Sequence, residues 1–243
     1  MTTNLATPIA NRTSITAESS PWAWLYRIGG AAALLSVVFF PIQIAVIMIN
    51  PPPDTVIGWF QLFQAHRLAG LLDLDLLLVA DQVLTILMFL ALYVVLWRVS
   101  RSFMLMGVAL GLLSTVLFIA SNPACAMLSL SDGYAAAVTD AQRAAFLAAG
   151  QATIAGWEGS AFHVSYIIGS IAAIAISAVM MRSGVFGRAT AWLGILSNAI
   201  ALGLYVPVIG RYISVFSVVF LWVWYLLTGL RLFRLARRST GEA

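Results

Sequence analysis

Charge is what this sequence has least of. Only 9% of its residues are charged and none of them is lysine, whereas a water-soluble domain carries roughly 25% charged residues to cover its surface. The mean hydropathy is +0.97. Together these values exclude a water-soluble fold and indicate an integral membrane protein.

Cysteine is also scarce, and the common catalytic motifs are absent. Cys125 is the only cysteine, which excludes an intrachain disulfide and any cysteine-based zinc or redox motif. The sequence has no glycine-rich phosphate loop, no paired-histidine metalloprotease helix and no Gly-x-Ser-x-Gly elbow. Its thirteen basic residues are all arginines, mostly at the ends of apolar runs. This pattern indicates membrane orientation and not nucleic-acid binding.

Six apolar runs are long enough to cross a bilayer, which takes roughly 20 residues. Because lipid cannot hydrogen-bond the backbone, and because no run alternates between polar and apolar residues, each run should be an α-helix. The predicted fold class is all-α, a polytopic membrane protein with six transmembrane helices. The predicted spans are 28–49, 74–97, 103–128, 160–181, 189–208 and 213–232. They form one transmembrane domain, 23–236, between a disordered cytoplasmic tail at 1–22 and a second cytoplasmic tail at 237–243.

The arginines predict how the chain is oriented in the membrane. Positive charge resists translocation, so the side that carries more arginine faces the cytoplasm. An even number of helices puts both tails on one side, and ten of the thirteen arginines fall on that side. Only Arg67, Arg143 and Arg211 lie opposite. The sequence therefore predicts that both termini are cytoplasmic.

Two outer loops are predicted to contain amphipathic segments that lie on the membrane surface. The first places Trp59, Phe60 and Phe63 at helical spacing after a run of prolines. The second, 132–158, has Thr139 and Gln142 at the spacing of a capping box, followed by an apolar stripe.

The predicted spans also contain signals for helix packing. Ser165, Gly169, Ala173 and Ser177 form a ridge of small residues down the fourth span, the pattern that allows close helix packing in lipid. This span is therefore expected to be central. In the third span Asn122 and Pro123 predict a local kink.

Polar residues gather at the outer end of the predicted bundle. Asp81 lies about 24 Å above the cytoplasmic end of its span and His163 about 28 Å above the end of its own, by the helical rise per residue. Asp81 shares a helix face with Thr85, as His163 does with Tyr166 and Ser170. We therefore predict a ligand-binding cavity open to the outside and lined by these five residues. The alternative is that the outer charges are ordinary interfacial residues, with Arg67 and Arg211 paired to Asp73, Asp75 or lipid phosphate, and that His163 bonds a neighbouring helix.

Three functions stay open. The first is a non-enzymatic bundle that binds or moves a small or lipid-like ligand through its outer half. The second is an intramembrane enzyme in which Asp81 and His163 hold a metal ion or act as acid and base. The third is a membrane-embedded partner subunit, docked through the ridge of the fourth span. The sequence predicts the lipid bilayer as a partner, no resident cofactor and no nucleic acid, and leaves the oligomeric state open.

Four short segments resemble a bacterial membrane family catalogued as domain of unknown function four-three-eight-six. They are 25–29 (LYRIG), 66–72 (HRLAGLL), 182–184 (RSG) and 192–194 (WLG). The family often has proline before the arginine of the last cytoplasmic turn, whereas Gly187 precedes Arg188 here. The resemblance implies a multi-helix protein of the plasma membrane and supplies no activity or catalytic residue.

Overall fold

A computed structural model describes residues 21–239, and this part of the chain contains helices and no strand. The helices are α1 (Ala23–Ile49), α2 (Val56–Ala65), α3 (Arg67–Asp73), α4 (Leu76–Leu96), α5 (Arg101–Ser121), α6 (Ala124–Ala136), α7 (Asp140–Trp157), α8 (Ser160–Arg182), α9 (Arg188–Ala201), the 3-10 helix η1 (Leu202–Tyr205) and α10 (Gly210–Ser239). Residues 1–20 and 240–243, which hold most of the two predicted tails, lie outside the described residues. Because α10 continues to Ser239, the last helix extends beyond the predicted end of the transmembrane domain at 236.

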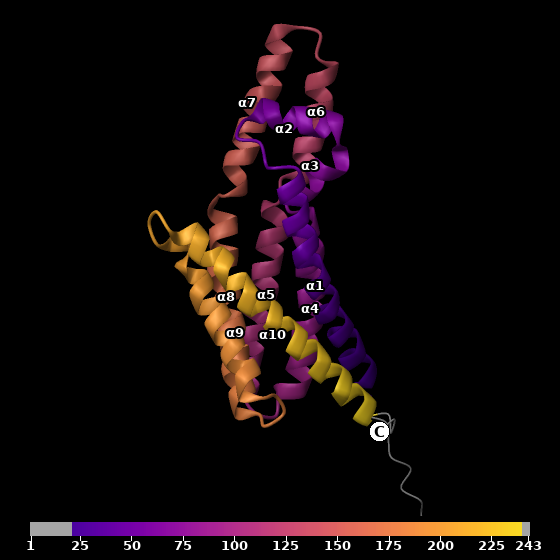
Figure 1. The fold of residues 1–243 in the computed structure, drawn as a ribbon, viewed down its shortest axis with the longest axis vertical. Coiled ribbons are helices and arrows are strands. Elements are labelled where there is room, and N and C mark those ends of the chain that lie inside the picture. Colours follow the sequence, from indigo (N-terminus) through magenta and orange to yellow (C-terminus); the bar gives the residue numbers. More distant parts are fainter. Residues whose placement is uncertain (1–20, 240–243) are drawn as a thin grey trace, which may run out of the picture.

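Five stretches are long and apolar enough to cross a membrane, so the protein is an all-α polytopic membrane protein. They are Ala23–Ile49, Leu76–Leu96, Arg101–Ala136, Asp140–Arg182 and Gly210–Ser239. The remaining predicted span, 189–208, is formed by α9 and η1, which together rise about 29 Å, close to the thickness of the hydrocarbon layer. Figure 1 shows that the start of α1 and the end of α10 lie at one end of the bundle, here called the inner end. An even number of crossings produces this arrangement.

The predicted third span, 103–128, is not one continuous helix. α5 ends at Ser121, and α6 begins at Ala124. The intervening Pro123 lacks the N–H that would continue the helix. The Asn122 side chain replaces the lost bonds: its Oδ1 accepts from the Ala124 backbone N–H at 3.1 Å, and its Nδ2 donates to the Leu74 carbonyl at 2.7 Å. The predicted kink is therefore a complete break between two helices.

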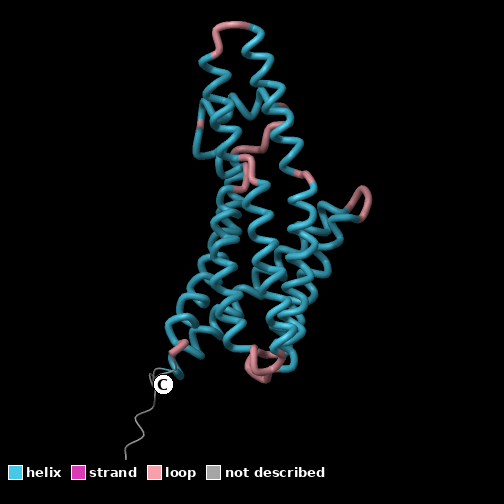
Figure 2. The backbone as a smooth tube through the Cα atoms, turned by 180° about the vertical axis from the view of Figure 1, so that it is seen from behind, coloured by secondary structure: helices cyan, strands magenta, loops and turns pink. Residues whose placement is uncertain are grey.

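Beyond this break lies a small helical unit, here called the outer cap, which consists of α2, α3, α6 and α7. α7 begins with the predicted capping box: Thr139 Oγ1 accepts from the Gln142 N–H, and Gln142 Oε1 accepts from the Thr139 N–H, both at 3.2 Å. Figure 2 shows α6 and α7 as a hairpin that projects beyond the bundle.

Both predicted amphipathic segments are helical, but their apolar faces pack against each other and do not face outward as a surface helix would require. In α2 the side chains of Trp59, Phe60 and Phe63 are at most 3% exposed and pack in one cluster with Met127 of α6. In α7, Phe146 packs against the same cluster. The apolar faces cover one another, so protein and not lipid buries them.

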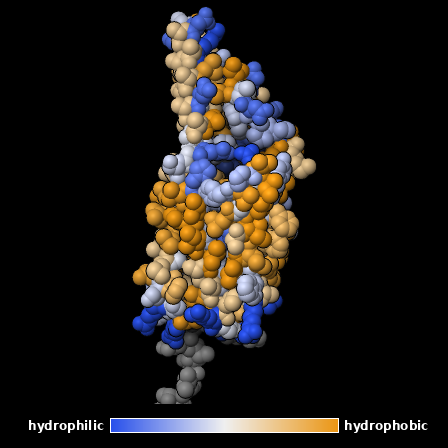
Figure 3. Space-filling model, turned by 90° about the vertical axis from the view of Figure 1, so that its left-hand side faces the viewer, coloured by the Kyte–Doolittle hydropathy of each residue, from blue (hydrophilic) through white to orange (hydrophobic). Residues whose placement is uncertain are grey.

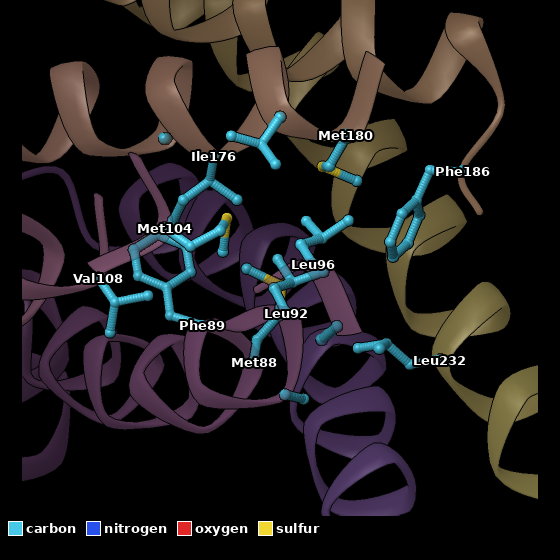
Figure 4. Close-up of a cluster of buried hydrophobic side chains, with 14 of the residues drawn as sticks. Met88, Phe89, Leu92, Leu96, Met104, Val108, Ile176, Met180, Phe186 and Leu232 are labelled. Carbon is cyan, nitrogen blue, oxygen red and sulfur yellow. The ribbon is translucent and has the colours of Figure 1, made fainter. Parts of the chain in front are cut away.

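The inner half of the bundle is filled with large apolar side chains. Figure 4 shows Met88, Leu92 and Leu96 of α4 facing Ile176 and Met180 of α8, and all five are 0% exposed. On the face shown in Figure 3, an apolar band covers the bundle, with hydrophilic residues at the inner end and around a hollow beyond the opposite edge of the band. The inner end is therefore a packed core, and polar groups concentrate toward the outer end.

The ridge of small residues in α8 is an internal seam. Ser165, Ala173 and Ser177 are at most 5% exposed. A Cβ on Gly169 would lie 2.5 Å from Ser114 Oγ of α5, so only glycine allows the two helices to approach this closely. The expectation that α8 is central is confirmed, and the ridge is not a free docking face for a partner subunit.

The close packing of α1 against α4 can be tested by a substitution at Gly29. A Cβ at this position would collide with Ala91 Cβ and lie 3.1 Å from the Leu87 carbonyl oxygen. We expect Gly29→Val to lower the free energy of unfolding by about 1–3 kcal/mol, measured by thermal denaturation in detergent. The matched control is Gly156→Val, because nothing lies within 4 Å of a Cβ there. Equal effects of the two substitutions would contradict the packing argument.

Candidate functional site

A cavity of about 370 Å³ lies between the helices in the outer half of the bundle. Its walls come from α1, α4, α5, α8, α9 and α10. Ligand pockets in proteins span roughly 300–1,000 Å³, so this volume suits a small molecule. Of the five residues predicted to line a cavity, Asp81, Thr85, Tyr166 and Ser170 do so.

α4 supplies the most polar wall. Asp75, Asp81, Gln82 and Thr85 all line the cavity, and the six residues from Asp75 to Asp81 correspond to about 9 Å of helical rise. The cavity therefore extends inward from the connection between α3 and α4 along several turns of α4.

Asp81 is the least satisfied of these side chains. It is 8% exposed, and its Oδ1 has no hydrogen-bond partner within residues 21–239. Ser36 of α1 lies beside the carboxyl, but its Oγ is likewise without a hydrogen bond in the described chain. A buried carboxylate oxygen without a partner is costly at this depth, and ionisable residues inside a membrane protein are usually functional.

Several other hydroxyls of the lining are bonded across helices. Thr85 Oγ1 and Tyr225 Oη lie 2.8 Å apart and join α4 to α10. Ser114 Oγ donates to the Ser165 carbonyl at 2.8 Å and joins α5 to α8. These bonds hold the walls of the cavity together.

Tyr166 makes a third bond of this kind. Its Oη lies 2.6 Å from Ser214 Oγ of α10 and 3.2 Å from the Ala201 carbonyl oxygen, to which it donates. A further, longer bond of 3.3 Å runs from Thr115 Oγ1 to Gln82 Oε1. Hydrogen-bonded side chains from α4, α5, α8 and α10 and a backbone carbonyl of α9 thus frame the cavity.

His163 does not lie where the sequence predicts it. It is not among the residues that line the cavity, and its Nδ1 lies 3.3 Å from Tyr205 Oη of η1. His163, Tyr166 and Ser170 lie within about 60° of one another around α8, but His163 is at the edge of this face and in the first turn of the helix, where it contacts η1 instead of the cavity. The bond to η1 agrees with the alternative in which this histidine contacts a neighbouring helix.

The structure therefore does not place Asp81 and His163 on one cavity, as a shared metal ion or an acid and base pair requires. Among residues 21–239, no three histidine, cysteine, aspartate or glutamate side chains gather in a way that could hold a metal ion. The enzyme hypothesis required Asp81 and His163 to act together, and the structure does not support this pairing.

The outer arginines also pair differently from the predicted alternative. Arg67 Nη2 lies 2.8 Å from Asp132 Oδ1, and Arg211 Nη2 lies 3.0 Å from Glu158 Oε1. Neither is paired with Asp73 or Asp75. The hairpin of α6 and α7 supplies these partners, and its position could not be read from the order of residues.

Asp75 lines the outer end of the cavity, and Asp73 lies two residues before it in the chain; both are outside the membrane-spanning segments. Asp73 is 3% exposed, and neither of its carboxylate oxygens has a hydrogen-bond partner in the described part of the chain. Burial raises its pKa to about 6. Burial also raises the pKa of Asp75 to about 7; a hydrogen bond from Trp157 opposes this shift, and the charges of Asp73 and Glu158 add to it.

Several lining residues were missed by the sequence reasoning. They are Gln82, Asn198, Ser114, Ser165, Ser214, Ser217, Trp224 and Tyr225. Asn198 Nδ2 donates to the Gly194 carbonyl of its own helix at 2.8 Å. A polar residue in the middle of an apolar run was the only signal for these positions, and it does not say which way a side chain points.

The pKa of Asp73 predicts how stability depends on pH. A carboxyl whose pKa is raised from 3.8 to about 6 favours the folded state at low pH. Its contribution is lost as pH rises from about 4 through about 6. The Asp73→Asn variant lacks this titration and therefore does not suffer the loss. We expect the free energy of unfolding of the variant, relative to that of the native protein, to be higher at pH 7.5 than at pH 4.5 by about 1–3 kcal/mol. Thermal denaturation at the two pH values measures the difference. Asp132→Asn, at an exposed ion pair, is the control, and an equal change at both pH values for Asp73→Asn would contradict the prediction.

The bond between Thr85 and Tyr225 can be measured with a double-mutant cycle. Thr85→Val and Tyr225→Phe each leave a buried hydroxyl without its partner, so each should destabilise the protein. The double variant should lose less stability than the sum of the two by about 0.6–1.7 kcal/mol, the range found for interhelical hydrogen bonds in membranes. The free energy of unfolding in mixed micelles gives these values. Thr85→Val combined with Thr190→Val, at the inner end of α9, should be additive, and additivity in the first pair would refute the coupling.

Comparison with known proteins adds no family to this description: no protein-family model, no curated protein and no solved structure matches the chain. The resemblance to domain of unknown function four-three-eight-six therefore stays a prediction from four short segments.

Proposed function

We propose that this protein is a multi-pass protein of the plasma membrane that binds a small ligand in the cavity of its outer half. One observation carries the proposal. A cavity of about 370 Å³ encloses the carboxyl of Asp81, a buried group without a partner for its Oδ1 among the described residues. A ligand that enters the cavity can supply the missing interaction.

The surrounding structure supports binding over a purely structural role. Unsatisfied buried polar groups destabilise a fold, and they persist where function requires them. The polar lining of the cavity ends above the packed core around Met88, Leu92 and Ile176. A site that contains a buried carboxyl, lies in the outer half and is closed below suits a ligand that arrives from outside.

The size of the cavity favours a small ligand over a lipid. A two-chain lipid is much larger than the enclosed volume, even though apolar side chains such as Phe89, Phe118 and Leu221 form much of the walls. The excess of arginine on the inner side supports the orientation in which the cavity faces away from the cytoplasm.

A second candidate is movement of the ligand across the membrane. The observation in its favour is that buried polar atoms without partners continue below the cavity within the described chain, at Ser177 Oγ and Thr228 Oγ1. Both residues are 0% exposed, so a path past them exists only if the helices move.

The accessibility of the cavity can be tested with single cysteines. In a Cys125→Ser background, Ser170→Cys places a thiol in the cavity wall, and Ser177→Cys places one two turns further along α8 where the helices are packed. A membrane-impermeant thiol reagent is added to intact cells that express each variant, and the remaining free thiol is counted after denaturation. We expect Ser170→Cys to be modified and Ser177→Cys to stay unmodified. Protection of Ser170→Cys would refute an open cavity, and modification of both would favour movement through the bundle.

A further inference from the structure

We propose that the ligand of the cavity is a small organic cation, an alkylammonium ion, held by the carboxylate of Asp81 beside the ring of Tyr225. This inference rests on the proposed function, because it names the chemical class of the ligand that the cavity binds.

The first argument is the charge of the walls. Asp75 and Asp81 both line the cavity, and no arginine or histidine is among its lining residues. The whole sequence contains no lysine. A cavity with two carboxyls and no base repels anions and attracts cations, and its low dielectric strengthens this preference.

The second argument is that the outer arginines have other partners. Each of them forms an ion pair with an acidic residue at the periphery: Arg67 with Asp132 at 2.8 Å, Arg143 with Asp140 at 3.8 Å and Arg211 with Glu158 at 3.0 Å. The carboxyl of Asp81 therefore has no cationic partner from this side of the bundle. An ionised carboxylate buried without a counter-ion is unfavourable, and a bound cation removes that cost.

The third argument is that the neutral groups of the lining are already bonded. The hydroxyls of Thr85, Ser114 and Tyr166 have partners within the bundle. A sugar or polyol would have to compete with those bonds. Trp224 Nε1 has no hydrogen bond within residues 21–239, but it lies against α9, about 2.5 Å from the place of a Cβ on Gly194. Asp81 Oδ1 is a buried carboxylate oxygen of the lining that a ligand can bond without breaking an existing hydrogen bond.

The fourth argument is the aromatic surface next to the carboxyl. Tyr225 lies close enough to Asp81 to feel its charge. Its ring packs edge-on against Phe40, with centroids 6.1 Å apart, and against Trp224, with centroids 5.4 Å apart. All three rings line the cavity. Aromatic rings beside a carboxylate bind alkylammonium groups, because ring faces attract the spread positive charge.

The test compares two thiol reagents of opposite charge on Ser170→Cys in the Cys125→Ser background. One is the trimethylammonium-ethyl methanethiosulfonate and the other is the sulfonatoethyl methanethiosulfonate. Each rate is divided by the rate of the same reagent at the exposed Cys125 of the otherwise native protein. We expect the normalised rate of the cationic reagent to exceed that of the anionic one by roughly tenfold or more. Asp81→Asn, which keeps the shape of the side chain, should remove most of this difference.

Competition identifies the ligand class directly. Choline is added during modification, and neohexanol, its uncharged isostere with carbon in place of nitrogen, is the matched control. We expect choline to slow the modification of Ser170→Cys and neohexanol not to. Neither this comparison nor the charge preference of the Ser170→Cys protein depends on how well Asp81→Asn folds.

The outcomes separate the two proposals. Equal normalised rates for the two reagents, or equal protection by choline and neohexanol, would overturn the cation while leaving a cavity open to ligands. No modification by either reagent would overturn the proposed function itself. A charge preference that survives Asp81→Asn in a folded variant would overturn the role of Asp81.

Discussion

Hydrocarbon offers no hydrogen bonds, so each polar group inside the bundle depends on the protein for a partner. The bond between Ser114 and the Ser165 carbonyl joins α5 to α8, and the bond between Thr85 and Tyr225 joins α4 to α10. These bonds lie in the walls of the cavity. The groups that line the site are therefore also the groups that fasten its helices together, and Gly169 permits the close approach that the bond from Ser114 requires. The need of buried polar groups for a partner within the protein therefore determines both the geometry of the site and the stability of the bundle.

The same helices are packed in one half and hollow in the other because their side chains differ in size. In the inner half, Met88, Leu92 and Met180 fill the space between α4 and α8 without exposure. In the outer half, small residues such as Ser114, Gly169 and Ser170 stand among the aromatic rings that line the cavity. Small side chains let helices approach but leave space where three or more helices meet. The cavity thus follows from the distribution of serine and glycine along the spans.

What could be predicted from the sequence is what depends on neighbours along the chain. Helical spans follow from length and hydropathy, and the capping box at Thr139 follows from local spacing. Asp81 and Thr85 are one turn apart, so their shared face is also local. The position of His163 relative to the cavity depends on how far α8 is rotated about its axis, and the partner of Arg67 depends on where a hairpin folds back. Both depend on the tertiary structure and not on the local sequence. The break at Asn122 was signalled by Pro123, but its completeness depends on the Leu74 carbonyl, which is far away in sequence.

The acidic residues at the outer end that lack an arginine partner would attract a cation to the proposed site from outside. Asp132 and Glu158 are neutralised by arginines, whereas Asp73 and Asp75 are not paired with them. Burial keeps the pKa of Asp73 at about 6 and that of Asp75 at about 7, so both carboxyls gain charge as pH rises through this range. Negative charge at the outer end of the cavity raises the local concentration of cations, and Asp81 lies about 9 Å further in along α4. A cation drawn to the outer end would move toward a carboxyl further inside the bundle, whose Oδ1 has no hydrogen-bond partner among the described residues. Its binding would stabilise the folded protein by mass action, which explains how a fold can retain a carboxyl that is otherwise unfavourable at this depth.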